Sequence, residues 1–217
     1  MVGIRGNGKV QSEDRPVESF SRIDVSAGLK VDWVPAERFL VQVEADENLL
    51  EVIETVVEGN KLYIRTKANI QRAKKQKVTV YAPHLKEIEI SGAVDLEAKG
   101  IVEEEYLKIE ASGASQIELE FIAQELDLEL SGASRLEFRG EVSSLKLHSS
   151  GASVADLEDL RASRASVDLS GASVADLWVK DELRISASGA SVLNYKGNAR
   201  VTRQELSGAS AINHKND

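Results

Sequence analysis

The sequence predicts an all-β fold, a single-stranded right-handed parallel β-helix (a solenoid) with a less regular N-terminal part. Two observations support this: a short string that returns at nearly fixed spacing, and strand-like alternation of apolar and polar residues around each copy. No part of the repeat shows the period of an α-helix. The string is Ser-Gly-Ala, and its copies, 18 to 21 residues apart, begin at Ser91, Ser112, Ser131, Ser150, Ser170, Ser188 and Ser207.

The segments between the copies alternate apolar and polar residues, as strands with one buried face do. Such a unit of about 20 residues cannot bury its own apolar face, so successive units must stack. At about 3.3 Å a residue, one unit gives a coil perimeter of about 60 Å. We therefore expect side chains about 19 residues apart to become neighbours, with Leu128, Leu147 and Leu169 in one interior row.

Each Ser-Gly-Ala copy is predicted to form the corner of a coil. Glycine can adopt the positive φ of a sharp turn, and serine can hydrogen-bond to the local backbone. The alanine is expected to point inward, where two sheets converge. Six of the seven copies continue with a second serine: Ser115, Ser134, Ser153, Ser173, Ser191 and Ser210.

The chain is predicted to form a single domain, residues 16–217, after a lead-in of residues 1–15 that is flexible or a frayed first strand. Irregular N-terminal coils should occupy residues 16–86 and regular Ser-Gly-Ala coils residues 87–217.

Residues 22–33 carry a degenerate copy of the repeat. Their apolar and polar positions match those of residues 87–98, which pairs the inward residue Trp33 with Ala98 and makes Trp33 a core residue. The other matched pairs are Ile23 with Ile88, Val25 with Ile90, and Val31 with Leu96.

Further strands are expected over residues 39–45, 52–57, 62–66 and 78–82, with a hairpin-like turn at residues 58–60. Asp46 is expected to cap a single helical turn over residues 47–50.

The last coil differs from the others in polarity. Where an earlier copy carries Leu126, Leu128 and Leu130, it carries Thr202, Gln204 and Leu206. Polar substitution in a terminal repeat indicates a cap, because an open end exposes unpaired strand edges.

Composition excludes several classes of protein. The formal net charge of −9 argues against a nucleic-acid-binding protein, because such proteins bind through a basic surface. The chain has no cysteine, hence no disulfide, thiolate zinc site or redox pair. No segment approaches the ~20 apolar residues of a transmembrane helix. The chain begins with a polar, Gly-bearing stretch and shows no signal peptide, as a mature form with its leader removed would.

Three strings and the repeated corners resemble a known family. They are Arg15-Pro16-Val17 with Phe20 and Ile23-Asp24-Val25, then residues 43–49, then residues 59–64. Together they are similar to the bacterial cell-envelope family described as a putative auto-transporter adhesin with a head GIN domain, a domain of unknown function. The resemblance covers roughly residues 15–215. It implies a right-handed parallel β-helix, export to the periplasm, outer membrane or cell surface, often as a lipoprotein, and adhesion. It brings no catalytic residues, and the missing leader and lipid-accepting cysteine leave anchoring open.

A column of acids and amides is expected on one outer face, one residue from each coil. Like charges at that spacing repel, so solvent, neighbouring Lys and Arg, or a bound cation such as Ca²⁺ should offset them. A solvated outer face is the favoured alternative, because calcium-binding repeats use a tighter Gly/Asp pattern. The column is Glu97, Glu118, Glu137, Asp156, Asp176, Asn194 and Asn213.

Two other features are candidate ligand contacts. The basic stretch of residues 67–77, with Lys74, Lys75 and Lys77, could meet an anionic glycan or lipid headgroup, although a solvated loop is the simpler interpretation. Trp178 falls on the outward parity, where an indole can stack on a sugar ring or pack against a neighbouring coil.

No catalytic residue and no cofactor are predicted. His84, His148 and His214 form no metal-binding spacing, and neither a Gly-x-Ser-x-Gly elbow nor a phosphate-binding glycine loop occurs. The first hypothesis is a non-enzymatic cell-envelope module that binds a glycan or other surface ligand. The alternatives are a polysaccharide lyase or hydrolase on the same fold, and an assembly protein that forms homo-oligomers through its helix ends.

Overall fold

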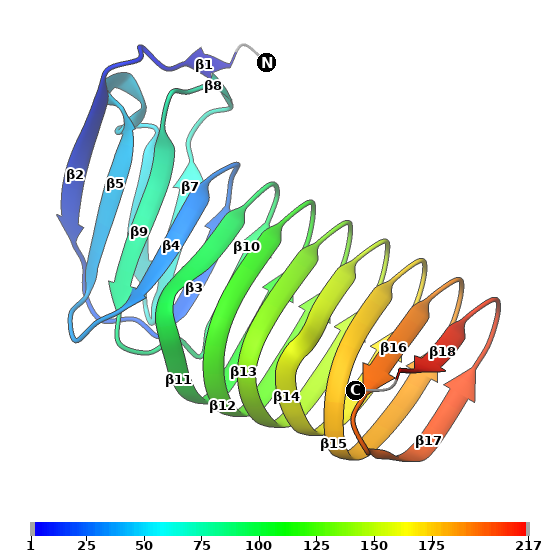
Figure 1. Ribbon diagram of the computed structural model, residues 1–217. Coiled ribbons are helices and arrows are strands. Elements are labelled where there is room, and N and C mark those ends of the chain that lie inside the picture. Colours follow the sequence, from blue (N-terminus) through cyan, green and yellow to red (C-terminus); the bar gives the residue numbers. More distant parts are fainter. Residues whose placement is uncertain (1–2, 216–217) are drawn as a thin grey trace.

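The computed structural model describes residues 3–215 and confirms the predicted fold class. Strands make up 69% of the chain, and no α-helix occurs among the described residues. The strands stack into a parallel β-solenoid of about seven turns (Figure 1). Its regular strands are β10 (Glu87–Ser91), β11 (Asp95–Ala111), β12 (Gln116–Leu130), β13 (Arg135–Ser149), β14 (Val154–Leu169), β15 (Val174–Ala187), β16 (Val192–Lys196), β17 (Arg200–Leu206) and β18 (Ala211–His214).

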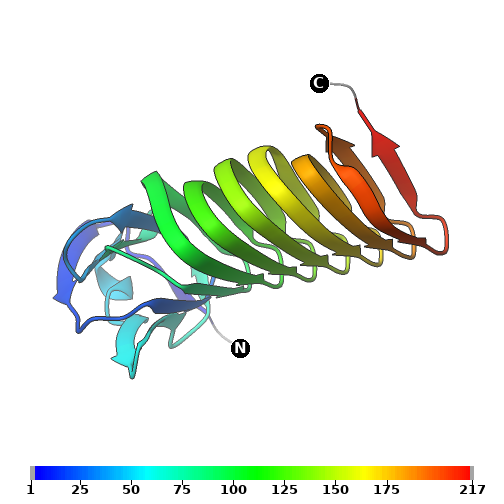
Figure 2. The ribbon, with the colours of Figure 1, turned by 90° about the horizontal axis from the view of Figure 1, so that it is seen from below.

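Each regular coil has two faces that meet on one side at a corner and on the other at a bend. Strands β11 to β15 run through the bend without interruption, so a coil contains one long strand and one tight turn. In Figure 1 the corners form the upper row of loops and the bends form the lower edge. We name the faces the post-corner face (residues 116–119 in one coil) and the pre-corner face (residues 126–130), and seen from below the coils lie in a regular row (Figure 2).

The coils stack in register, as the repeat predicts. Leu128 pairs with Leu147, and the row continues with Val167. The prediction that Leu169 belongs to this row was wrong: Leu169 pairs with Ser149, one inward position further along the strand. Counted from the corner, Leu128 and Leu147 precede their serine by three residues and Leu169 by one, so the corner sets the register.

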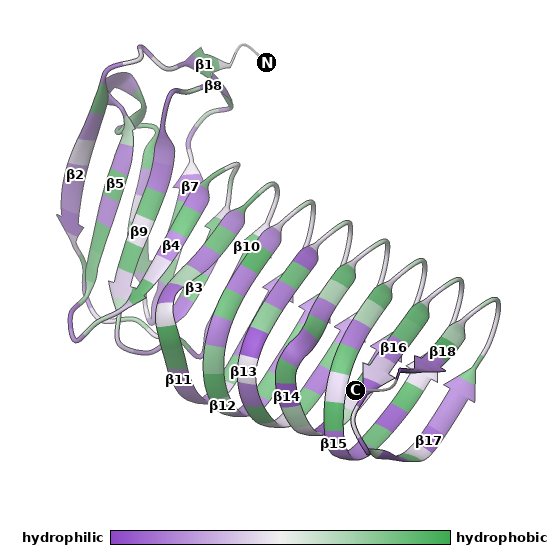
Figure 3. Cartoon of the chain, viewed as in Figure 1, coloured by the Kyte–Doolittle hydropathy of each residue, from purple (hydrophilic) through white to green (hydrophobic). Residues whose placement is uncertain are grey.

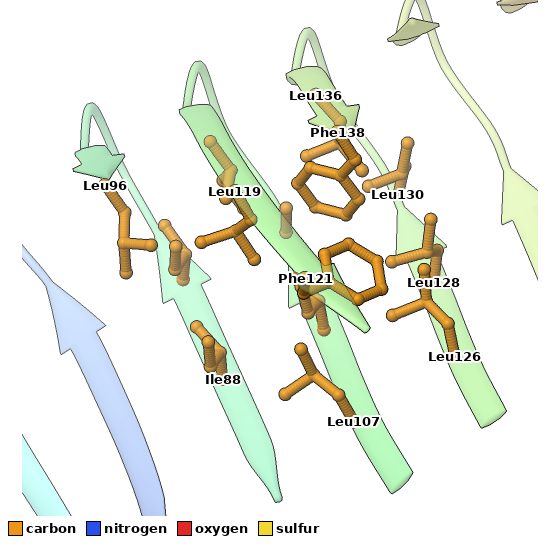
Figure 4. Packing of buried hydrophobic residues seen from close by; sticks show 14 of the residues in the cluster. Ile88, Leu96, Leu107, Leu119, Phe121, Leu126, Leu128, Leu130, Leu136 and Phe138 are labelled. Carbon is orange, nitrogen blue, oxygen red and sulfur yellow. The ribbon is translucent and has the colours of Figure 1, made fainter. Parts of the chain in front are cut away.

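Alternating side chains fill a narrow interior between the two faces. Bands of opposite hydropathy cross every long strand (Figure 3), in keeping with a period of two. Leu128 lies beside the ring of Phe121 and Leu130 beside the ring of Phe138 (Figure 4). The two rings meet edge to face with centroids 5.5 Å apart. The core therefore extends as one stripe through all the coils.

The Ser-Gly-Ala corner has the predicted glycine conformation. Gly151, for example, has φ +81°, and a Cβ there would lie 2.5 Å from the carbonyl oxygen of Gly132 in the previous coil. The amide of Ala152 donates to that same oxygen at 2.7 Å. Glycine is therefore required both by the turn and by the close approach of successive backbones.

The orientation predicted for the corner alanine was wrong. Ala152 is exposed, whereas Ser153 after it is fully buried. The hydroxyl of Ser153 donates to the carbonyl oxygen of Ser150 across the turn at 3.1 Å, which satisfies a polar group that would otherwise be costly to bury. The inward corner position therefore takes the second serine of the tetrad.

The predicted degenerate repeat near residue 20 is confirmed by strand pairing. β3 (Arg22–Ser26) lies parallel to β10, with Ile23 opposite Ile88. β4 (Lys30–Pro35) lies parallel to β11, with Trp33 opposite Ala98. Trp33 is fully buried, as predicted, and its Nε1–H donates to the carbonyl oxygen of Ala82 at 3.1 Å.

One more coil precedes this pair in space although it follows it in sequence. β7 (Lys61–Thr66) is parallel to β3, and β9 (Gln76–Ala82) is parallel to β4. Antiparallel strands then cover the end: β6 (Ile53–Glu58) pairs with β7 in the predicted hairpin, and β5 (Leu40–Asp46) pairs with β9.

The outermost layer includes part of the expected lead-in. β2 (Val10–Pro16) pairs antiparallel with β5 over seven residues, and β1 (Ile4–Arg5) pairs with β8 (Ile70–Arg72). This end of the sheet is thus closed by a change from parallel to antiparallel pairing, a way of avoiding an open solenoid edge.

Asp46 holds this layer together but does not cap the helical turn as expected. The turn exists as η1 (Glu47–Leu49), without a side-chain hydrogen bond from Asp46. The buried carboxylate instead accepts hydrogen bonds from the amides of Gly8, Lys74 and Lys75. Burial acts to raise the pKa of Asp46, but these donors together lower it below its usual value.

The C-terminal end is less covered. β17 and β18 pair on one side only among the described strands. Gln204 and Leu206 occupy inward positions, as predicted, and Leu206 is 46% exposed. Thr202 does not: a register shift places Val201 opposite Leu183 and leaves Thr202 outside the ladder. Oligomerisation through this end stays a prediction.

Candidate functional site

The predicted column of acids and amides exists in register. Glu97, Glu118, Glu137, Asp156, Asp176, Asn194 and Asn213 pair one after another along the post-corner face. The column also continues to Asp32, which the sequence analysis missed although Asp32 lies in the degenerate repeat opposite Glu97.

Neighbouring groups offset much of the column's charge. Lys99 lies 2.5 Å and Lys30 3.7 Å from the Glu97 carboxylate, and the hydrogen bond from Lys99 lowers the pKa of Glu97. At the other end, Asn194 and Lys215 each donate to Asp176 at 2.9 Å. Among residues 3–215, no three His, Cys, Asp or Glu side chains are grouped so that they could hold a metal ion.

The three candidate lysines lie in the N-terminal part, bound to acids there. Lys77 lies 2.5 Å from Asp32 and Lys75 lies 3.2 Å from Glu44, while Lys74 donates its backbone amide to Asp46. The structure does not bring these lysines together with Trp178, which lies on β15 several coils away. Their role in ligand binding stays a prediction.

The bend carries two neighbouring hollows. One hollow of 720 Å³ is lined by Tyr106 and residues 103–105, and a second of 350 Å³ reaches Trp178 and Lys180. Both are lined by residues 122–124, so they form one groove across the coils. We name this groove and its rim the bend surface: Ile101, Glu103, Tyr106, Ile122, Gln124, Glu141, Ser143, Arg161, Ser163, Trp178 and Lys180.

Exposed apolar side chains gather on the bend surface. Ile101 is 53%, Ile122 47% and Tyr106 39% exposed. The only comparably exposed large apolar residues of the described chain are Val10 and Leu206, near the two ends. Grouped exposed apolar residues mark contact surfaces more often than scattered ones do.

Trp178 has the outward parity predicted for it and lies at the C-terminal end of the bend surface. It is half-buried, and the Arg161 guanidinium stacks 4.4 Å from the ring centroid, a favourable cation–π geometry. Gly197 of the next coil passes close by, where a Cβ would lie 3.3 Å from the indole. Arg161 and the neighbouring coil thus hold the indole in place.

A second groove runs along the pre-corner face beside the corners, with a volume of 280 Å³. One wall is a column of Asp24, Glu89, Glu110, Glu129 and His148 in register, and the other consists of the first serines of the corners. The sequence analysis missed this acidic groove, although its acids recur two residues before each corner.

The acids at one end of this groove differ in pKa. Burial, together with the charge of Glu89, raises the pKa of Asp24. Burial acts in the same direction on Glu89, but hydrogen bonds from Lys61 and Glu87 lower its pKa instead.

Comparison with protein families agrees with this architecture. The family model described as "Putative auto-transporter adhesin, head GIN domain" matches residues 19–199. The chain belongs to this family. The match confirms the resemblance seen in the sequence. Among residues 3–215 of this head GIN chain, no helix is long and apolar enough to cross a membrane.

Solved structures share the head GIN fold over almost the whole chain. A putative adhesin from Bacteroides fragilis has a TM-score of 0.87 at 22% identity, covering 99% of this chain and 100% of its own. One from Parabacteroides merdae has a TM-score of 0.83 at 20% identity, covering 98% of both chains. A protein described as a putative lipid binding protein from Parabacteroides distasonis has a TM-score of 0.78 at 19% identity, covering 98% of this chain and 99% of its own. A comparison with curated proteins found no match.

Proposed function

We propose that this head GIN chain is a non-enzymatic module of the cell envelope that binds a glycan along the bend surface. The observation that supports this most is the exposure of Tyr106 and Ile122, which line the same hollow, with exposed Ile101 nearby on the same long strand as Tyr106. The adhesin description of the family and of two structural neighbours agrees with surface binding.

The chemistry of the bend surface suits a saccharide. Apolar side chains and the Trp178 ring offer contacts for sugar ring faces, and Gln124, Ser143 and Glu141 offer hydrogen-bond partners for hydroxyls. The groove crosses the coils, so equivalent positions recur every ~4.8 Å. This spacing is close to the length of one sugar unit in a polysaccharide, so successive coils could contact successive sugars.

A glycan array with the purified chain tests this proposal. Binding should be specific, and the Ile122→Ser and Trp178→Ala variants should lose it. Ile122→Ser should keep the wild-type melting temperature, because Ile122 is 47% exposed. Val10→Ser is the matched control, because Val10 is also exposed but lies outside the bend surface.

Unchanged glycan binding by both bend variants would overturn the proposal. Phosphatidylglycerol–phosphatidylcholine vesicles in the same assay address a lipid ligand, in view of the neighbour described as lipid binding. Binding to vesicles without binding to any glycan would also count against it.

The acidic groove supports one second candidate, a polysaccharide-active enzyme. Asp24 and Glu89 sit on adjacent strands, with pKa values shifted in opposite directions, an arrangement that acid–base pairs in glycosidases use. Release of reducing ends from soluble polysaccharides, abolished in Asp24→Asn and Glu89→Gln, would favour this function. Equal release by wild type and both variants would remove it.

A further inference from the structure

A pocket of 420 Å³ lies on the pre-corner face between β13 and β15, apart from both grooves described above. Its lining residues come from three adjacent strands, and Ser166 lies on the middle one, β14. Ser166 pairs with Lys146 on one neighbouring strand and with Arg184 on the other. Arg164, two residues earlier on the same face of β14, lines the same pocket.

The charges of this column show what is missing at Ser166. The column begins with two cations, Lys61 and Arg22, and from Arg22 onward the sign alternates in register: Arg22, Glu87, Lys108, Asp127 and Lys146. If the alternation continued, the residue after Lys146 would be an acid. The residue there is Ser166, and the one after it is Arg184. Three cations therefore surround one neutral serine.

Asp127 lies opposite Lys146 on the neighbouring strand, but an ion pair at 4.0 Å or less offsets only one of these cations, Arg184. Glu182 is the single carboxylate lining the pocket, and it already accepts hydrogen bonds from Arg184 and Thr202 at 2.9 and 3.0 Å. Within residues 3–215, neither Lys146 nor Arg164 forms an ion pair at 4.0 Å or less. The pocket is thus a local cationic site in a chain whose net charge is −9.

We propose that this pocket binds one anionic group, a carboxylate or sulfate, of an acidic saccharide. The anion takes the place of the missing acid above Ser166, accepts hydrogen bonds from Lys146, Arg164 and the serine hydroxyl, and lies next to Arg184. Ser144 and Arg164 of the pocket directly follow Ser143 and Ser163 of the bend surface in sequence. A glycan bound to the bend surface can therefore place an acidic substituent in this pocket. We call this the saccharide step; it rests on the proposed function, whereas the anion site itself does not.

Calorimetric titration of the full chain with sodium sulfate, at ionic strength fixed with sodium chloride, tests the anion site. We expect saturable sulfate binding, weakened roughly tenfold in Lys146→Gln and in Arg164→Gln. Ser166→Asp should abolish it and raise the melting temperature without sulfate, because the carboxylate completes the alternation. Ser186→Asp is the matched control: it lies on the same face between Asp168 and Glu205, so it should lower the melting temperature and keep sulfate binding.

Absence of saturable sulfate binding, or undiminished binding by Ser166→Asp, would overturn the site. For the saccharide step, oligogalacturonates and sulfated oligosaccharides are compared with neutral oligosaccharides on wild type and Ser166→Asp. We expect only the acidic ligands to be weakened by Ser166→Asp. If inorganic sulfate binds but acidic and neutral saccharides respond alike, the saccharide step is wrong while the anion site stands. If no saccharide binds at all, the proposed function itself fails.

Discussion

The corner and the bend of this solenoid are built by opposite rules. At the corner, seven coils repeat the same three residues. In six of them the backbone of the previous coil lies so close to the glycine that an added Cβ would clash with it. At the bend, one outward column reads Glu103, Ile122, Glu141, Arg161 and Trp178. Constant residues on one edge and varied residues on the other indicate that the corner maintains the stack, whereas the bend accepts different side chains. In a repeat protein, a functional site is expected where the pattern is broken.

The largest expected effect is at the corner glycines. Gly151→Ala should lower the free energy of unfolding by about 4 kcal/mol, because it combines a positive φ with a clash against the previous backbone. Gly59→Ala is the matched control, since Gly59 also has positive φ but a Cβ added there would meet no atom within 4 Å. Urea unfolding of both variants measures the difference, and equal losses would show that close stacking adds nothing at the corner.

Next in size is the interior row that the corner aligns. Leu128→Ala should cost about 3 kcal/mol, because Leu128 is fully buried between equivalent residues of adjacent coils. Val201→Ala, in the partly exposed last coil, should cost less than half as much. Thermal unfolding followed by circular dichroism compares the two, and a larger loss for Val201→Ala would contradict the assignment of the core.

A smaller effect is expected at the buried corner serines. Ser173→Ala removes a hydroxyl that donates to the Ser170 carbonyl at 2.8 Å, at a cost of about 1 kcal/mol. Ser170→Ala, at the less buried first serine of the same corner, should cost less. A larger loss of unfolding free energy in Ser170→Ala than in Ser173→Ala, measured by urea unfolding, would contradict this prediction.

The smallest effect on stability is expected at the bend. Gln124→Ala should change the free energy of unfolding by less than about 0.5 kcal/mol, because Gln124 is exposed and outside the core. A loss above about 1 kcal/mol in urea unfolding would mean that the bend, too, maintains the stack.

The stacking geometry could be predicted from the sequence because a fixed spacing and a period of two leave few alternatives. The column from Glu97 to Asn213 and the pairing of Trp33 with Ala98 follow from counting residues away from each corner. The row predicted for Leu169 was wrong because that prediction did not count residues from the corner. The direction of Ala152 could not be derived, because both alanine and serine are small enough for the interior and only the turn geometry decides between them.

The candidate sites were harder to predict than the fold. The sequence identified Trp178 by its parity, but not the groove it borders, because the groove joins residues from different coils. The pocket at Ser166 depends on which residue types are absent from a column, and recognising this requires the register of seven strands at once. The placement of residues 61–82 before residues 22–35 in space also has no local signal, because it is fixed only by which strand edges remain free to pair.

The central claim is that the ligand binds at the bend and not at the corner. Placing a large side chain at each edge in turn tests this claim. Ser143→Trp places a large side chain in the bend surface, and Ala152→Trp places the same side chain on an exposed corner. Binding to the best glycan of the array is then measured for both. The account predicts that Ser143→Trp loses binding and Ala152→Trp keeps it; loss in Ala152→Trp alone would contradict it.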